Sequence, residues 1–147
     1  MTLGALLFSS INCLGIEQYY NNDFTDSITL ETKFGNMTIE EECDSTSSFI
    51  YFHGQIIESE YLKPTAKECT TSNIDKVQGN LLFSIDSSGI LLNCSLFEKT
   101  EINSFNTLLV ELANEITKKY KNKKIFNCNM NNYPVETTLL PITFTLE

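Results

Sequence analysis

The sequence is 147 residues long, 41% hydrophobic and 11% aromatic, which suits a folded domain and is too apolar for an intrinsically disordered chain. Its 19 acidic residues outnumber 10 lysines, and with no arginine the net charge is −9. Because arginine is the usual reader of bases and phosphates, nucleic acid is not an expected partner. The sequence predicts a single domain over residues 1–147.

Half of the lysines fall within one short segment near the C-terminus. They are Lys118, Lys119, Lys121, Lys123 and Lys124. One interpretation is the C-terminal end of a helix, where lysines interact favourably with the helix dipole. The other is a basic surface that docks onto an acidic protein, and the two are compatible.

The N-terminal segment 1–15 is apolar and ends in small residues, which loosely matches a secretory signal peptide. Cleavage near Gly15 would leave two N-glycosylation sequons, at Asn36 and Asn93. It would also leave four cysteines able to form two disulfides in an oxidising compartment, namely Cys43, Cys69, Cys94 and Cys128. A secreted two-disulfide protein-binding domain is therefore one alternative.

An intracellular protein is the favoured alternative. A signal peptide begins with a positive charge, but the first positive side chain of this chain is Lys33. Cysteines at strand-like core positions also behave as small hydrophobic residues when reduced. The apolar run is too short to span a membrane. We expect a cytoplasmic protein that is also found in the nucleus and does not associate with membranes.

In chain order, the first expected element is a hairpin. Apolar and polar residues alternate over residues 27–33, which predicts a half-buried strand. Gly35-Asn36 suits a two-residue turn, so residues 27–40 are expected to form a hairpin. That turn would place Thr32 opposite Ile39.

A strand with two apolar faces is expected next. The acidic stretch 40–44 before it is interpreted as a solvated connection, since contiguous carboxylates without a glycine do not make a calcium loop. Residues 48–53 are apolar on both faces. One face should meet the core, and the other a helix of this chain or a partner.

The middle of the chain predicts a long connection and a second hairpin. Residues 55–79 are mixed and polar, contain Pro64, and are expected to be mostly loop with a short turn of helix. Two apolar runs, 81–85 and 90–97, flank a turn-forming sequence and predict the hairpin.

The strongest helical signal follows, because six apolar residues recur at three- and four-residue steps. They are Phe105, Leu108, Leu109, Leu112, Ile116 and Tyr120. Ser104 or Asn103 is the expected cap, and strands at 125–130 and 142–146 complete the chain. The segregated elements predict an α+β fold, with antiparallel β-sheet built from hairpins and one long amphipathic helix packed on it.

The residue types that carry catalysis and metal binding are sparse. His53 is the only histidine and ends an aromatic strand without a nucleophile nearby, so a structural role is favoured over that of a general base. No two cysteines have the close spacing of a zinc site, and no glycine-rich phosphate-binding loop occurs. The sequence predicts a protein that is not an enzyme and has no metal or cofactor. The rival hypothesis is a carboxylate pair brought together by folding.

Several core patterns, in their order and spacing, resemble one known family. They are Asp23–Thr25, Ser48–Gly54, Gly79–Ile85, Leu112–Lys119, and Lys124–Phe126 with Asn131–Asn132. On these residues the chain resembles the proteasome assembly chaperone 4 family, the smaller members of the heterodimer that chaperones 3 and 4 form. The N-terminal segment and the tail after Asn132 depart from the family pattern.

The resemblance implies a non-catalytic chaperone. It would form a heterodimer with a related small chaperone and bind an α-type subunit, and so promote assembly of the α-ring of the 20S proteasome. From strand alternation and charge we expect Phe49, Tyr51 and His53 to contact the partner and the five lysines to steer the subunit. The chain ends in Thr145-Leu146-Glu147. It thus lacks the tyrosine tail of the other assembly-chaperone pair and would bind through its surface.

Overall fold

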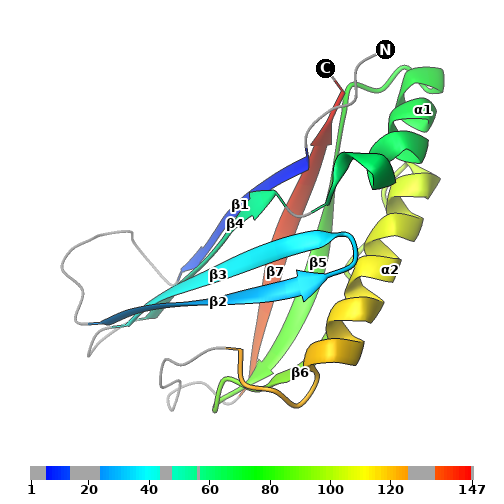
Figure 1. Cartoon of the computed structure of the whole chain (residues 1–147). Helices are drawn as coiled ribbons and strands as arrows, with labels where there is room; N and C mark the ends of the chain where they lie inside the picture. The colour runs from blue at the N-terminus through cyan, green and yellow to red at the C-terminus, as the bar shows by residue number, and fades with distance from the viewer. Residues whose placement is uncertain (1–5, 14–23, 44–47, 56, 126–134, 147) are drawn as a thin grey trace.

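The computed structural model describes residues 6–13, 24–43, 48–55, 57–125 and 135–146. Seven strands form one antiparallel sheet in the order β2-β3-β4-β1-β7-β5-β6, and two helices lie on one of its faces (Figure 1). The elements are β1 (Leu6–Cys13), β2 (Phe24–Thr32), β3 (Gly35–Cys43), β4 (Ser48–Gln55), the 3₁₀ turn η1 (Ser59–Leu62), α1 (Lys63–Thr71), β5 (Lys76–Asp86), β6 (Leu91–Leu96), α2 (Asn103–Tyr120) and β7 (Val135–Thr145). The predicted α+β class with antiparallel sheet is confirmed.

The first hairpin is present, but its turn comes two residues earlier than predicted. β2 and β3 pair so that Thr32 lies opposite Gly35, and the turn residues are 33–34. The expected pairing of Thr32 with Ile39 is therefore wrong. Both predicted strands exist, but β3 continues to Cys43, so residues 40–43 of the acidic stretch belong to a strand and not to a connection.

Phe34 explains the shifted turn. Its side chain is only 3% exposed, and its ring meets that of Tyr61 edge-to-face with centroids 5.0 Å apart. The Thr32 hydroxyl accepts hydrogen bonds from the backbone N–H groups of Phe34 at 3.1 Å and Gly35 at 3.2 Å. Gly35 follows with φ 149°, a backbone conformation that favours glycine. Burial of the aromatic ring thus decides where the chain reverses.

The N-terminal apolar segment contains a central strand of the sheet. β1 pairs over residues 7–13 with β4, and Leu6 and Leu7 pair with Phe144 and Thr143 of β7. β1 therefore joins the β2-β3-β4 half of the sheet to the β7-β5-β6 half.

A second helix occupies part of the segment predicted to be loop. Pro64 lies in the first turn of α1, where its missing N–H breaks no helical hydrogen bond. Three side chains of this short helix reach the core, namely Thr65, Ala66 and Cys69. The expected short turn of helix is present, but the prediction that residues 55–79 are mostly loop was wrong. Tertiary burial, and not a strong periodicity, stabilises α1.

The other predicted strands differ in their bounds. The second hairpin is present as β5 and β6, although β5 already begins at Lys76. The last strand begins at Val135, seven residues before the predicted start at Ile142. The strand predicted over 125–130 lies outside the described residues, apart from Ile125.

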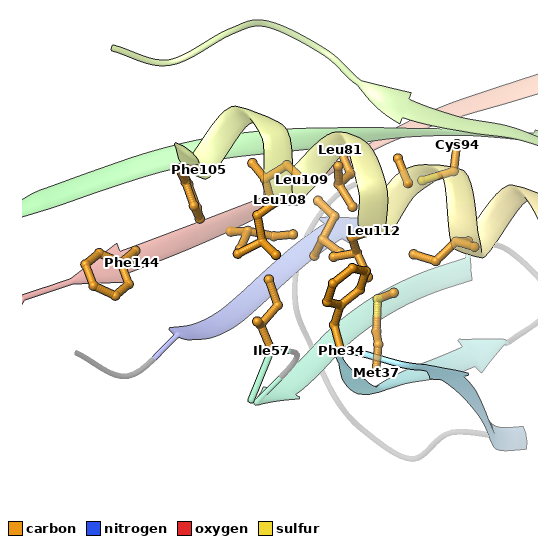
Figure 2. Packing of buried hydrophobic residues seen from close by; sticks show 14 of the residues in the cluster. Phe34, Met37, Ile57, Leu81, Cys94, Phe105, Leu108, Leu109, Leu112 and Phe144 are labelled. Carbon is orange, nitrogen blue, oxygen red and sulfur yellow. The ribbon is translucent and has the colours of Figure 1, made fainter. Parts of the chain in front are cut away.

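The core lies between α2 and the sheet. Buried residues alternate along β5 with partly exposed ones, so that Leu81, Phe83 and Ile85 face the helices. Figure 2 shows Leu109 and Leu112 of α2 extending from the helix into this cluster. The predicted apolar stripe of the helix is therefore its packed face.

Gly79 allows α2 to approach β5 closely. A Cβ atom at this position would lie 2.4 Å from Cδ1 of Leu109 and 3.5 Å from Cε2 of Phe105. Both of these side chains are fully buried, so the missing side chain leaves the space that they fill.

The cap of α2 comes from the neighbouring helix. The N-cap residue is Ile102, whose side chain makes no cap hydrogen bond. Instead, the Glu68 carboxylate of α1 accepts hydrogen bonds from the backbone N–H groups of Ser104 and Asn103, both at 2.8 Å. These bonds, that from Ser104 foremost, lower the pKa of Glu68. The prediction of Ser104 or Asn103 as the cap was wrong, because a side chain distant in sequence supplies it.

Candidate protein-binding surface

Helix α2 contacts both edge strands of the sheet, β2 and β6. The sheet is curved so that its two edges approach the same helix (Figure 1). Edge strands carry backbone N–H and C=O groups that can pair with other chains unless something covers them. The way in which α2 covers these edges therefore decides which backbone groups remain accessible.

At the β6 edge, the Thr117 side chain bonds the backbone of one residue, Cys94. Its hydroxyl accepts a hydrogen bond from the backbone N–H of Cys94 at 3.1 Å and donates one to the backbone C=O of the same residue at 3.0 Å. Leu91, nearer the start of the strand, is bonded by the segment after α2. Its N–H donates to Lys123 O at 3.0 Å, and its C=O accepts from Asn122 N at 2.8 Å.

At the β2 edge, side chains from the C-terminal turn of α2 form hydrogen bonds with the backbone of Glu31. The backbone N–H of Glu31 donates to the Tyr120 hydroxyl at 2.7 Å. The Glu31 C=O accepts a hydrogen bond from Lys119 Nζ at 2.6 Å. One turn earlier in α2, the Glu115 carboxylate accepts a hydrogen bond from the backbone N–H of Lys33. The C-terminal half of α2 thus holds both sheet edges.

The five lysines form a basic pole around the C-terminus of α2. Lys118 and Lys119 lie in its last turn, and all five side chains are exposed. The Nζ atoms of Lys119 and Lys123 lie 5.7 and 5.9 Å from the centre of the Tyr120 ring. Among the described residues no carboxylate pairs with any of the five. Lys118 and Lys119 thus lie at a helix end, as the first interpretation of the cluster predicts.

Between β6 and the N-terminal half of α2 lies an opening that we call the β6–α2 groove. It consists of two adjoining hollows of about 340 and 390 Å³, both lined by Leu96, Lys99 and Val110. Phe97 lines the larger of them. The side chains of Phe97 and Val110 are 48% and 41% exposed, and both line the larger hollow. The floor of the groove is therefore largely apolar.

A further hollow of about 410 Å³ lies on the other flank of α2. It is bounded by Phe34 at the hairpin tip, by Tyr61 and Pro64, and by Leu108 and Glu111 of α2. Phe34 and Leu108 also belong to the core. This hollow is thus a surface continuation of the core beside the exposed Glu111.

The predicted binding residues of β4 lie in the middle of a four-stranded stretch, with β3 on one side and β1 on the other. Phe52 lies opposite the fully buried Ile39. By register, residues 49, 51 and 53 therefore belong to the sheet face away from the helices. For Phe49, Tyr51 and His53 the structure describes the backbone and not the side chains. The structure does not bring these positions together with the basic pole.

Sequence reasoning missed Phe97 and Val110. Val110 does not belong to the buried stripe of α2. The sequence could have indicated its exposure, since an apolar residue off the core-facing stripe of a helix lies at the surface. The apolar run 90–97 predicts that Phe97 belongs to the strand, but β6 ends at Leu96. Its exposure depends on where the strand ends, which alternation alone does not determine.

The described residues contain no group of three or more histidine, cysteine, aspartate or glutamate side chains placed to hold a metal ion. Cys69 and Cys94 are free and buried, and burial raises the pKa of both thiols. Neither described helix is both long and apolar enough to cross a membrane.

Comparison with known proteins gives no match to a family model, a curated protein or a solved structure.

Proposed function

We propose that this chain is a non-catalytic assembly chaperone that binds a related small chaperone as a heterodimer and an α-type subunit, and so promotes assembly of the 20S proteasome α-ring. The proposal rests on the resemblance described above and on surfaces suited to binding proteins. The observation that carries it is the exposure of Phe97 and Val110 in one groove. Large apolar side chains exposed together are typical of a surface that another protein covers.

The sheet face away from the helices is a second surface open to a partner. Both helices lie on the other face, and no described element covers this one (Figure 1). Residues 49, 51 and 53 belong to it by register. We assign the related chaperone to this face, because a sheet surface offers the broad contact area that permanent heterodimers bury.

The basic pole would steer the α-type subunit. The whole chain carries a charge of −9, so five neighbouring lysines create a local field of opposite sign. Charges at the rim of an interface act mainly on the association rate and are screened by salt. An acidic patch on the subunit is the expected complement.

The secreted two-disulfide domain is the second candidate function. The exposed side chains of Asn36 and Asn93, the sequon asparagines, favour it. Against it, two of the four cysteines that it needs, Cys69 and Cys94, are buried and free. Cleavage near Gly15 would also remove β1 from between β4 and β7. The balance of these observations favours the assembly chaperone.

Affinity purification of the tagged chain from its own cells, followed by mass spectrometry, tests the proposal. The expected result is an uncleaved chain with free thiols that recovers a small partner together with proteasome α-type subunits. A cleaved, glycosylated or disulfide-bonded chain without α-type subunits would replace the proposal with the secreted alternative.

A charge-reversal pair tests the steering role. The test variant changes to glutamate the three pole lysines other than Lys119 and Lys123, whose side chains lie over the Tyr120 ring. These three are Lys118, Lys121 and Lys124. The matched control makes the same change at three exposed lysines elsewhere, namely Lys63, Lys67 and Lys76. At low salt the test variant should associate about tenfold more slowly with the α-type subunit, and the control variant should be affected much less. Equal rates for both variants would refute steering by the pole.

A further inference from the structure

The end of the β6 edge has a backbone position that no described residue bonds. Phe97 donates its backbone N–H to Asn80 O of β5 at 2.9 Å, so the N–H and C=O of the preceding residue, Leu96, point away from β5. Cys94, two residues earlier, points to the same side and is bonded by Thr117. No described residue bonds the backbone of Leu96. A donor and an acceptor are thus available side by side at the end of the strand.

This open position lies in the β6–α2 groove. Leu96 lines both hollows of the groove, together with Val110 on the opposite wall. Phe97 adds a second exposed apolar side chain beside it. Unpaired main-chain groups beside an apolar pocket are the two parts of a strand-addition site, in which the main chain supplies affinity and the pocket supplies selectivity.

We propose that the β6–α2 groove binds a short extended segment of a partner protein, which pairs with Leu96 as an added strand and places an apolar side chain against Val110. This inference rests on the proposed protein-binding function and gives its mode of contact. In an antiparallel pair, directly opposite residues share a face of the sheet. The residue opposite Leu96 therefore points into the groove, as the Leu96 side chain does.

The closed part of the edge excludes a second copy of the sheet as the occupant. Thr117 covers Cys94, and residues 122–123 cover Leu91, so a folded neighbour cannot pair along the whole of β6. Hollows of about 340 and 390 Å³ hold a few side chains. Both the closed edge and the small hollows therefore favour a short segment.

Charge at the groove specifies the segment further. The lining carries two carboxylates, those of Glu98 and Glu111, and one ammonium group, that of Lys99. No described residue forms an ion pair with them. A segment with a cationic side chain next to its apolar residue complements this lining. The expected ligand is therefore an extended peptide of mixed apolar and basic character.

The direct test is an NMR titration of the full-length ¹⁵N-labelled chain with the end-blocked peptide Lys-Thr-Val-Thr-Lys. The control peptide carries an N-methyl group on its central valine, which removes the N–H that would donate to the Leu96 C=O. We expect saturable chemical-shift changes of the Leu96 and Val110 amides. The methylated peptide should bind about tenfold more weakly, because it lacks one hydrogen bond. Absence of a saturable shift at Leu96, or equal affinity for both peptides, would overturn the proposal.

Matched variants separate the groove from other exposed apolar positions. Val110→Ser should weaken peptide binding, whereas Leu139→Ser, at an exposed apolar position of β7, should leave it unchanged. Equal effects of the two variants would also count against the site.

The proposed function and this site can fail separately. If the peptide binds as expected but affinity purification recovers no proteasome subunit or related chaperone, the function is wrong and the site stands. If these partners are recovered equally by the Val110→Ser variant and the Leu96 amide gains no exchange protection in the complex, the site is wrong and the function stands.

Discussion

Replacement of Thr117 by valine would remove the hydroxyl that closes the β6 edge. Valine keeps the shape of the side chain and has nearly the same helix propensity as threonine, so the change isolates the two hydrogen bonds to Cys94. Cys94 is 3% exposed, so water cannot readily replace the lost hydroxyl. At about 1 kcal/mol for each bond, Thr117→Val should lower the free energy of unfolding by about 2 kcal/mol.

Urea denaturation followed by circular dichroism measures this loss, and Thr117→Ser is the matched control because it keeps the hydroxyl. Hydrogen exchange provides a second readout, since the Cys94 amide should lose protection in the valine variant only. A valine variant as stable as the serine variant, with the Cys94 amide still protected, would refute the idea that Thr117 closes this edge.

Three further predictions concern packing, capping and thiol reactivity. Gly79→Ala should lower the free energy of unfolding by about 1 to 3 kcal/mol, because its Cβ would meet Leu109. In a Leu109→Ala background the same change should be neutral or stabilising. Urea denaturation of the wild type, the two single variants and the double variant shows whether the sign of the stability change depends on Leu109. The pKa of Glu68 is lowered from its ordinary value of 4.5 by hydrogen bonds from α2, so its stabilisation is present above that pH and is lost as the pH falls through the lowered value. The wild type should accordingly melt at a higher temperature than Glu68→Gln near neutral pH, and this difference should disappear in acid. A difference in melting temperature that does not depend on pH would contradict the capping role. Cys69 and Cys94 should resist N-ethylmaleimide at pH 8 in the folded chain and react after unfolding, because burial shields both thiols and raises their pKa; rapid labelling of either one in the native protein would contradict this.

The candidate binding surface was only partly accessible to sequence reasoning. The lysine cluster could be recognised because charge is a property of the sequence, and its position at the end of α2 follows from the apolar stripe that precedes it. The groove could not be recognised, because it lies between Leu96 of β6 and Val110 of α2. Its position depends on packing between two elements and leaves no local pattern.

Local periodicity determined the elements whose burial is one-sided. Alternation located the first hairpin, and the three- and four-residue spacing located α2, because the repeat of a helix or strand follows directly from which face is buried. Two apolar runs around a turn-forming sequence located the second hairpin. The α+β class with antiparallel sheet followed from the order of these elements. This much was available from the 147 letters of the sequence.

Features that depend on residues distant in sequence follow from the assembled fold. The first turn lies at residues 33–34 because the Phe34 ring packs against Tyr61. The cap of α2 comes from Glu68 of α1 and not from the residues expected beside the helix. Residues 6–13 became a central strand because two strands far along the chain pair with them. In each case the deciding quantity is the burial or hydrogen bonding of a group by a distant partner. Such pairings are set when the whole chain assembles, so no window of the sequence contains them.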